Sequence, residues 1–482
     1  MKFKNLISTA IVIAAQLLLL TACSLAPEYN IPDTHVPENY DATGLKWTEP
    51  HPDDDCDRGD WWKIFQDPQL NELEEKLNKD NFNIAAAAAQ YNEALALVDQ
   101  ARAAFFPVIS ATANGMKQKA IGATKTVTTR TLTLNSSWEL DLWGAVASNV
   151  DANIASAEAL EYGLESVRLS SQASLAQFYI EYCTVRHDDG ILNQIVQASD
   201  KNLKYMRSRY NAGVAGNADI LQAEILLSNA QTELINNGIN LNLYRHAIAV
   251  LVGEQPSTFK LAPCAYDHTP HDIPLGIPST LLERRPDIAQ AERLMAQANA
   301  GIGVARAAYF PAVSLSAANI IQGNGLHNLF SFPLTGWSAG VSAVQSIFNG
   351  GAQIAATTAA EEKFNTNVAA YRQTVLSAFQ DVEDNIATLD HLREQEKVQK
   401  HATQKAKNAF ALVENQYRAG TVDYASVLAF RITYYDSLRA SSDVEGLRVS
   451  SEIGLIKALG GMWNTEPEES QPTSEEECND QN

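Results

Sequence analysis

The longest pattern in the chain is a repeat of apolar residues at gaps of three and four positions, and it occurs twice. One copy follows Gly144, and the other follows the pair Gly350-Gly351. The apolar positions are Val146, Val150, Ile154, Ala157, Leu160, Leu164 and Val167, and then Phe364, Val368, Tyr371, Val375, Phe379, Val382, Ile386 and Leu389. Their mean spacing is close to that of a coiled-coil seam. No proline interrupts residues 145–209 or 352–416, so we expect two helices, each roughly 100 Å long.

Segments that alternate polar and apolar residues precede each long helix, which is the pattern typical of strands. In the first copy the alternating positions are Leu132, Leu134, Ser136, Trp138, Leu140 and Leu142. Their counterparts in the second copy lie at 313–316 and 337–348, with less regular alternation. The pattern predicts two strands in each copy, within about 107–143 and 311–348.

The two copies share their junctions as well as their patterns. Residues 101–107 read ARAAFFP and residues 305–311 read ARAAYFP, an offset of 204. Further along, YNAG at 210–213 corresponds to YRAG at 417–420, an offset of 207. An offset that drifts so little indicates duplication of a domain-sized unit rather than a short solenoid repeat.

In each copy we expect the same order of elements. An alanine-rich helix ends at a proline, which lacks an N–H and disfavours helix in the residue before it. Two strands and the long helix follow, and a glycine then turns the chain into a second helix. The first helices are expected at 84–104 and 288–308, and the returning helices at 217–253 and 424–459.

The N-terminus has the features of a bacterial lipoprotein signal. Lys2 and Lys4 precede an apolar run at 6–20 that is too short to span a membrane comfortably. Leu-Thr-Ala-Cys then matches the lipoprotein box, so we expect acylation of Cys23 and an anchor in outer membrane lipid. Ser24, in place of an aspartate, favours the outer membrane. An ordinary signal peptide with a chance cysteine is the alternative.

These observations give an expected domain organisation for the whole chain. It comprises a signal peptide at 1–22, a lipidated segment at 23–80, a first repeat at 81–258, a connector at 259–283, a second repeat at 284–460 and an acidic tail at 461–482.

Composition excludes several functional classes. Fifty-seven acidic residues against 36 basic ones give a net charge of −21, which argues against nucleic acid as a partner. The sequence contains no phosphate loop, catalytic triad or cluster of metal ligands, so we expect no cofactor, no metal and no enzymatic activity. Four further cysteines lie far apart, and sequence alone does not pair them: Cys56, Cys183, Cys264 and Cys478.

The number of predicted strands has a consequence for assembly. Four strands cannot lie alone in lipid, because their edges would leave unpaired backbone groups. They also cannot close a barrel, since the smallest membrane barrels have about eight strands. If the strands are membranous, the protein must be an oligomer. The alternative is a small soluble sheet that caps a coiled coil.

Several motifs identify the family that the chain resembles. They are WWKIF at 61–65, ERRPDI at 283–288, GVARAAYFP at 303–311 and LGG at 459–461. By these motifs the chain resembles TolC-like outer membrane factors of the lipoprotein branch, the outer components of tripartite RND efflux pumps. The resemblance covers nearly the whole mature chain. The resemblance implies a homotrimer with a twelve-stranded outer membrane β-barrel, continued by a twelve-helix periplasmic α-barrel. It also implies a periplasmic adaptor (membrane fusion) protein and an inner-membrane RND transporter as partners.

The same resemblance places a gate at the periplasmic tip, where the helices turn at Gly213 and Gly420. Tyr417 and two acidic residues after the turns, Asp219 and Asp423, are then expected to form the constriction. Tyr424, which follows Asp423, is expected to belong to it as well. Asp219 has a second interpretation as an acid at a helix N-terminus. The second turn departs from the family, because Ala425 and Ala429 replace its usual leucine and aspartate.

The repeated junctions are expected to mark where the chain enters the membrane. Their aromatic pairs suit a membrane interface, and the proline ends the helix where a strand begins. The residues are Phe105, Phe106 and Pro107, and Tyr309, Phe310 and Pro311. The function predicted from the sequence is a passive, gated export duct for drugs or other small toxic compounds. A channel for type I protein secretion and a non-channel coiled-coil lipoprotein are the alternatives.

Overall fold

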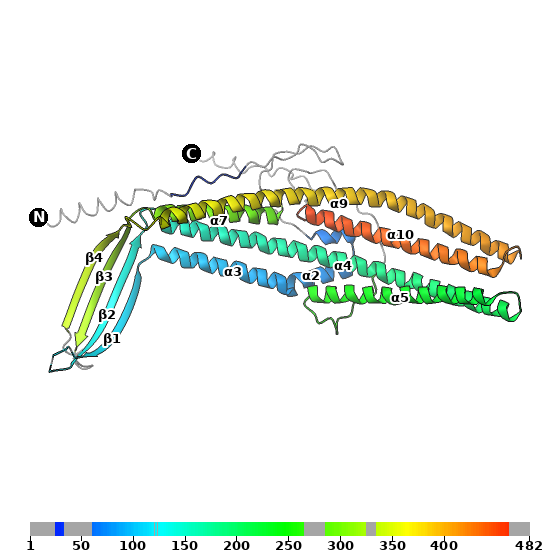
Figure 1. Ribbon diagram of the computed structural model, residues 1–482, viewed down its shortest axis with the longest axis horizontal. Coiled ribbons are helices and arrows are strands. Elements are labelled where there is room, and N and C mark those ends of the chain that lie inside the picture. The colour runs from blue at the N-terminus through cyan, green and yellow to red at the C-terminus, as the bar shows by residue number, and fades with distance from the viewer. Residues whose placement is uncertain are drawn as a thin grey trace, which may run out of the picture. The chain divides into compact units, whose positions relative to one another are not determined.

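The computed structural model describes residues 25–32, 60–119, 121–122, 124–264, 285–323 and 334–461. The described chain is mainly helical and contains one sheet (Figure 1). Short 3-10 helices lie at Trp61–Phe65 and Ala103–Phe105. The α-helices are α2 (Pro68–Asp80), α3 (Phe82–Arg102), α4 (Ala145–Asn211), α5 (Asn217–Leu251), α7 (Pro286–Ala307), α9 (Ala352–Arg418) and α10 (Tyr424–Ala458). The strands are β1 (Val108–Gln118), β2 (Val127–Leu140), β3 (Ala312–Gly323) and β4 (Leu334–Val344).

The two long helices predicted from the apolar seam are confirmed as α4 and α9. Each contains 67 residues, and each is followed by a turn and a helix of 35 residues, α5 or α10. The seam of α9 faces inward: Tyr371, Val375, Val382, Ile386 and Leu389 are all buried. The duplicated α-hairpins therefore follow from the spacing of apolar residues.

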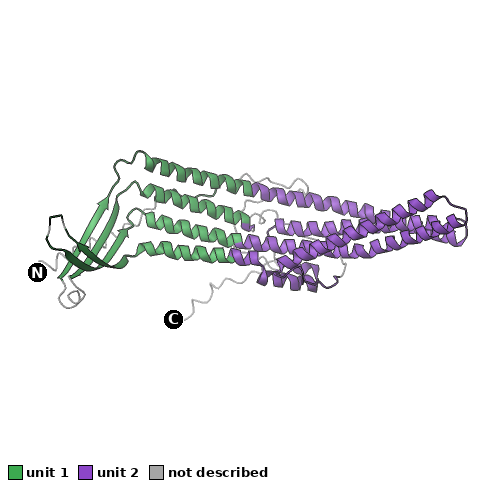
Figure 2. Cartoon of the chain, turned by 60° about the horizontal axis from the view of Figure 1, so that its bottom comes forward, with its two compact units in different colours: residues 1–34, 88–163, 287–374 green, residues 35–87, 164–286, 375–482 purple. Residues whose placement is uncertain are grey.

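The chain divides into two compact units, coloured separately in Figure 2. Unit 1 comprises residues 1–34, 88–163 and 287–374, and unit 2 comprises residues 35–87, 164–286 and 375–482. Both long helices contribute to both units, with α4 divided after Gly163 and α9 after Thr374.

Unit 1 contains the sheet, in which the strands pair antiparallel in the order β1-β2-β3-β4. The four predicted strands are therefore confirmed. Strand β4 ends at Val344 rather than near Phe348, because its partner β3 begins only at Ala312, directly after Pro311. Strands β1 and β4 are exposed along their whole length, and both form edges of the sheet in this single chain.

The N-terminal segment 25–32 packs along α7 within unit 1. The Tyr29 hydroxyl donates to the carbonyl oxygen of Glu292 at 3.2 Å and also to its carboxylate. Asn299 Nδ2 donates to the carbonyl of Pro27 at 3.0 Å. A Cβ on Gly303 would lie 2.9 Å from the Cβ of Ala26, so only glycine leaves room for this contact. The expected lipid anchor, Cys23, lies just outside the described residues, as do the signal peptide and nearly all of the acidic tail.

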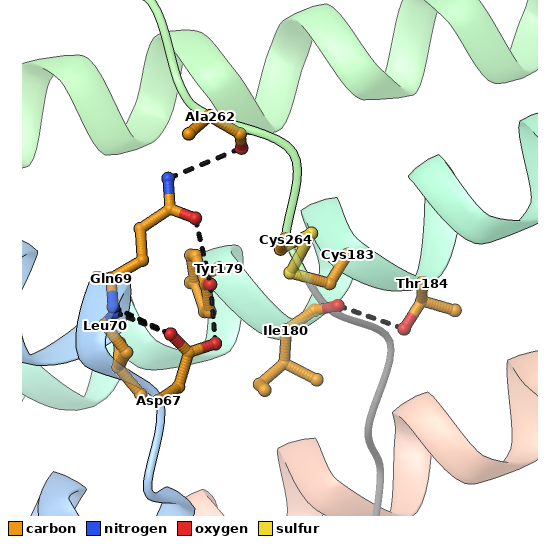
Figure 3. Close-up of a disulfide and its surroundings, with 9 residues drawn as sticks. All are labelled: Asp67, Gln69, Leu70, Tyr179, Ile180, Cys183, Thr184, Ala262 and Cys264. Carbon is orange, nitrogen blue, oxygen red and sulfur yellow. Dashed lines mark hydrogen bonds between the residues drawn. A yellow bond between two sulfur atoms is a disulfide. The ribbon is translucent and has the colours of Figure 1, made fainter.

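The core of unit 2 forms where α2 packs against α4, α5 and α10. Its largest fully buried side chains include Trp61, Leu77, Tyr179, Ile248 and Ile453. Asp67 caps α2, because its Oδ1 accepts from the backbone N–H of Gln69 at 2.8 Å and of Leu70 at 3.2 Å. The Tyr179 hydroxyl donates to the other oxygen of Asp67 at 2.6 Å, which attaches the cap to α4 (Figure 3).

A disulfide between Cys183 and Cys264 joins α4 to the segment that follows α5 (Figure 3). The two Cα atoms lie 5.7 Å apart, and 81 residues separate the cysteines in sequence. The sequence did not pair them. Among the described residues, no helix is both long and apolar enough to cross a membrane.

Candidate functional site

Each α-hairpin turns on a glycine in a left-handed backbone conformation. The φ angles are 73° at Gly213 and 74° at Gly420. In the first turn, the N–H of Gly213 donates to the carbonyl of Tyr210 at 2.9 Å, and the N–H of Val214 donates to that of Arg209 at 3.0 Å. The second turn repeats both bonds at 2.9 and 3.0 Å. This pair of bonds is a Schellman motif, which satisfies the last carbonyls of a helix and reverses the chain.

Asp423 is the N-cap of α10 and connects this helix to the first hairpin, α4 and α5. Its Oδ1 accepts from the backbone N–H of Ser426 at 3.0 Å and from the Ser426 hydroxyl at 2.6 Å. Its Oδ2 accepts from Arg209 Nη1 at 3.1 Å. The hydrogen bonds from Ser426, and then the charge of Arg209, lower the pKa of Asp423 below its ordinary value. The carboxylate is therefore ionised at neutral pH.

Three tyrosine rings contact one another in a row that reaches this ion pair. Tyr424 lies edge-on to Tyr205, with centroids 5.4 Å apart, and Tyr417 lies 5.2 Å from Tyr424. The guanidinium of Arg209 also lies 5.8 Å from the centroid of the Tyr205 ring. We name these five residues the tip clasp: Tyr205, Arg209, Tyr417, Asp423 and Tyr424.

The tip clasp joins the two hairpins of one chain, because Tyr205 and Arg209 belong to α4 whereas the other members lie at α9 and α10. Its ion pair is partly exposed, with 35% of the Arg209 side chain and 43% of the Asp423 side chain accessible. Ion pairs of this kind contribute about 0–1 kcal/mol. The clasp can therefore hold the turns together and still release them reversibly.

The predicted gate residues do not all meet. Tyr417, Asp423 and Tyr424 share the clasp, whereas Asp219 lies in the first turn of α5 and accepts from the N–H of Gly216 at 2.8 Å. Within the described residues, Asp219 makes no hydrogen bond or ion pair with the second hairpin. The bond to Gly216 fits the second interpretation of Asp219, in which it is an acidic residue at a helix N-terminus.

The two alanines that depart from the family lie in the first turns of α10. Ala425 is half-buried and Ala429 is exposed. Neither can supply a bulky apolar plug or a ring of carboxylates. The clasp instead places a charged and two aromatic groups at this end of the second hairpin: Asp423, Tyr417 and Tyr424.

The helix-to-strand junctions lie in unit 1 and present aromatic rings to the surface. Between 40% and 68% of each ring residue is exposed: Phe105, Phe106, Tyr309 and Phe310. Trp143 stacks on Phe310 with centroids 4.8 Å apart, and its Nε1–H donates to the carbonyl of Pro311 at 2.8 Å. Trp143 therefore ties the end of the first strand pair to the start of the second.

Sequence reasoning missed three of these residues. Arg209 and Tyr205 lie one turn apart near the C-terminus of α4, where a basic residue also suits the helix dipole. Trp143 directly precedes Gly144, which opens the long helix. In each case the partner is more than 160 residues away in sequence, so no local pattern could indicate the contact.

Comparison with known families gives two matches along the chain. The family model described as "Outer membrane efflux protein" matches residues 73–254 and 277–461. The two matches begin 204 residues apart, which is the offset between the repeated junctions.

Curated relatives resemble the chain over most of its length. One is the "Pyoverdine export outer membrane protein OpmQ" of Pseudomonas aeruginosa, which is 28% identical over 86% of this chain and 89% of the relative. Another is the "Probable efflux pump outer membrane protein TtgC" of Pseudomonas putida, which is 28% identical over 95% of this chain and 96% of the relative.

Solved structures share the fold. The outer-membrane channel OprN superposes with a TM-score of 0.80 at 28% identity, covering 92% of this chain and 100% of the OprN chain. The Campylobacter jejuni CmeC outer membrane channel gives a TM-score of 0.83 at 23% identity, covering 92% of this chain and 96% of the CmeC chain.

Proposed function

The chain belongs to the outer membrane efflux protein family, and on that premise we propose that three copies form a passive export duct. The sheet carries this proposal. It has four strands, and its edge strands β1 and β4 are exposed, with apolar residues such as Val108 and Val341 at the surface. In a bilayer such edges must pair, because lipid offers no hydrogen bonds. Pairing β4 of one copy with β1 of the next would close a twelve-stranded barrel.

The energy for export would come from partners. The described residues contain no group of three or more potential metal ligands, and the sequence contains no nucleotide-binding motif. We infer that a periplasmic adaptor and an inner-membrane RND transporter supply substrate and drive it through a continuous helical tunnel. Acylation at Cys23 would hold each copy to outer membrane lipid.

The tip clasp would keep the duct closed at its periplasmic end. The ion pair of Arg209 and Asp423 and the ring contacts of Tyr424 join α4 to the second hairpin of the same copy. Separation of these helices would widen the tip. With alanine at 425 and 429, closure in this chain would depend on the clasp more than on an apolar plug.

We propose small toxic compounds as the cargo. OpmQ is named for pyoverdine export, and other relatives are named for antibiotic and toluene efflux. One fold thus serves chemically different cargo, which fits a duct that contributes width and charge rather than a binding pocket. The acidic excess of this chain, −21 in net charge, would favour cationic compounds.

Assembly can be tested on the purified full-length protein in detergent. The native mass should be three times that of the acylated chain, and the protein should form conducting pores in a planar bilayer. A monomer without conductance would contradict the proposal. A conducting trimer that restores protein secretion, but not compound efflux, to a strain lacking its own channel would favour the secretion alternative.

The gate can be tested with Arg209→Gln, which removes the charge of the clasp. Loss of a partly exposed ion pair should shift opening by a factor of up to about five per clasp. We therefore expect greater uptake of a bulky antibiotic by cells and a larger open fraction in bilayers.

Arg207→Gln is the matched control. Arg207 lies two residues away and pairs with Glu224 at 2.8 Å inside the first hairpin, so it does not join the hairpins to each other. Equal leak through both variants, or no leak through Arg209→Gln, would remove the clasp from the gate.

A further inference from the structure

Helices α4 and α10 belong to different hairpins, yet they meet closely along one seam in unit 2. A Cβ on Gly446 of α10 would lie 2.5 Å from the hydroxyl of Thr184 on α4, so glycine leaves the room that the Thr184 side chain occupies. Towards the C-terminus of α10, Gln177 Nε2 donates to the carbonyl of Ser450 at 3.3 Å, and the Ser450 hydroxyl donates to Glu181 at 3.3 Å.

Towards the C-terminus of α4, past Thr184, the contact between the two helices contains a buried carboxyl group. Asp188 lies four residues after Thr184 and is only 4% exposed. Its Oδ1 has no hydrogen-bond partner, and the nearby charge of Asp443 on α10 acts on it. A buried carboxyl group that faces a second carboxylate favours its protonated form. Asp443 is exposed, which gives that proton a path to solvent.

The cation beside this pair is shared with another carboxylate. Arg439 of α10 acts on both Asp188 and Asp443, and it is also paired with Glu233 of α5. On α4, Glu181 accepts from the Ser450 hydroxyl and also interacts with the charge of Asp443. His187 of α4 interacts with the charge of Glu445 on α10. Lys400 of α9 pairs with Glu396 and Glu445.

We propose that Asp188 and Asp443 form a proton-dependent latch between the two hairpins, and that this latch regulates the gate. The second part rests on the proposed function; the first does not. A proton on Asp188 holds α4 against α10, and its loss leaves two negative charges facing each other across the two helices.

The direction of the response follows from the environment of Asp188. Burial, and then the charge of Asp443, raises the pKa of Asp188 from 3.8 to about 7 while the seam is closed. In an open seam, water would return the pKa towards its ordinary value. The closed form therefore binds the extra proton, so its advantage is largest in acid, falls as the pH rises towards about 7, and is constant above that.

The seam continues from the latch to the tip clasp. Past Asp188, α4 contributes Ile191, Leu192 and Ile195 to an apolar cluster that also contains Ile432, Tyr435 and Leu438 of α10. Beyond it lie Arg209 and Asp423, at a distance of roughly 30 Å along α4. Because the same two helices carry both contacts, loosening the latch lowers the cost of separating the clasp.

The latch can be tested by hydrogen–deuterium exchange on the full-length protein in detergent. After correction for the chemical effect of pH, amides at 184–192 and 439–446 should exchange faster as the pH rises from 5 to 7, by up to about tenfold per pH unit. Asp188→Asn, which keeps a neutral group of the same shape, should abolish this rise. Asp189→Asn, which makes the same charge change one residue away, and His187→Gln should keep it.

Coupling to the gate is measured on the same variants in planar bilayers. The open fraction of the wild type should rise over the same pH range, and that of Asp188→Asn should stay low and flat. Identical exchange profiles for the wild type and Asp188→Asn would overturn the latch, even if the protein is a conducting trimer. A pH-dependent seam in a protein that never conducts would support the latch and contradict the export duct.

Discussion

Two buried charged side chains in unit 2 differ in whether they have hydrogen-bond partners. Arg285, in the motif ERRPDI, donates to the carbonyl of Ala458 at 3.1 Å and to Asp381 at 3.0 Å. Glu74 of α2 is fully buried, and neither of its carboxylate oxygens has a hydrogen-bond partner. Burial raises the pKa of Glu74 well above its ordinary value, so the folded protein favours its neutral form.

Glu74→Gln should make stability less dependent on pH. The native state holds a proton on Glu74 that the unfolded chain releases near pH 4.5, so wild-type stability falls as the pH rises above that value. The variant has no such loss and should be more stable at pH 8 by about 1–3 kcal/mol. Thermal unfolding at pH 5 and pH 8 measures the difference. Glu75→Gln, at the exposed neighbour, should behave as the wild type, and equal shifts in both variants would contradict this account.

At the scale of elements, each hairpin depends on a helix that ends at a defined residue. Gly213 and Gly420 have positive φ and open space around the Cβ position, so conformation rather than crowding excludes other residues there. Gly190, in the middle of α4, also has open space around it but has helical φ. The chain therefore contains glycines whose substitution should have opposite effects.

Gly420→Ala should destabilise the protein by about 1–2 kcal/mol, because an L-residue is strained in the left-handed region. Gly190→Ala should stabilise it by about 0.5–1 kcal/mol, because alanine restricts the unfolded chain and favours helix. Chemical unfolding of both variants in detergent gives the two values. A loss of stability in both would mean that α4 needs glycine at 190 for packing.

At the scale of the whole molecule, two copies of one plan are joined by contacts that the duplication does not repeat. The disulfide uses Cys183 of α4, and residue 390, the position 207 residues later, is Asp. Similarly, the latch uses Asp188 of α4 and Asp443 of α10, so the two hairpins have different roles in the seam. The family model matches both copies, although they have diverged where they meet.

Replacing both cysteines, as Cys183→Ala with Cys264→Ala, should lower stability by about 2–4 kcal/mol, since the bond closes a long loop in the unfolded chain. A reductant should lower the melting temperature of the wild type towards that of the double variant. It should leave the double variant unchanged. An effect of reductant on the double variant would point to another cysteine, and no effect on the wild type would mean that this bond contributes little.

Much of the fold could be predicted because its signals are local. The apolar spacing of α4 and α9 depends on residues three and four apart, the turns at Gly213 and Gly420 on one residue each, and β2 on strict alternation. The strand ends were less certain, because a strand stops where its partner stops, as β4 does opposite Ala312. The domain boundaries, the lipid anchor at Cys23 and the gate roles stay predictions.

The sequence by itself determined the duplication, the long hairpins, the four strands and the family. Each of these is encoded by neighbouring residues or by a motif. Only the tertiary structure decided which distant groups meet: Cys183 with Cys264, Trp143 with the carbonyl of Pro311, Arg209 with Asp423, and Asp188 with Asp443. These contacts depend on the packing of helices and strands far apart in the chain. The aromatic junctions and glycine turns were visible in the sequence, whereas the contacts that join one hairpin to the other were not.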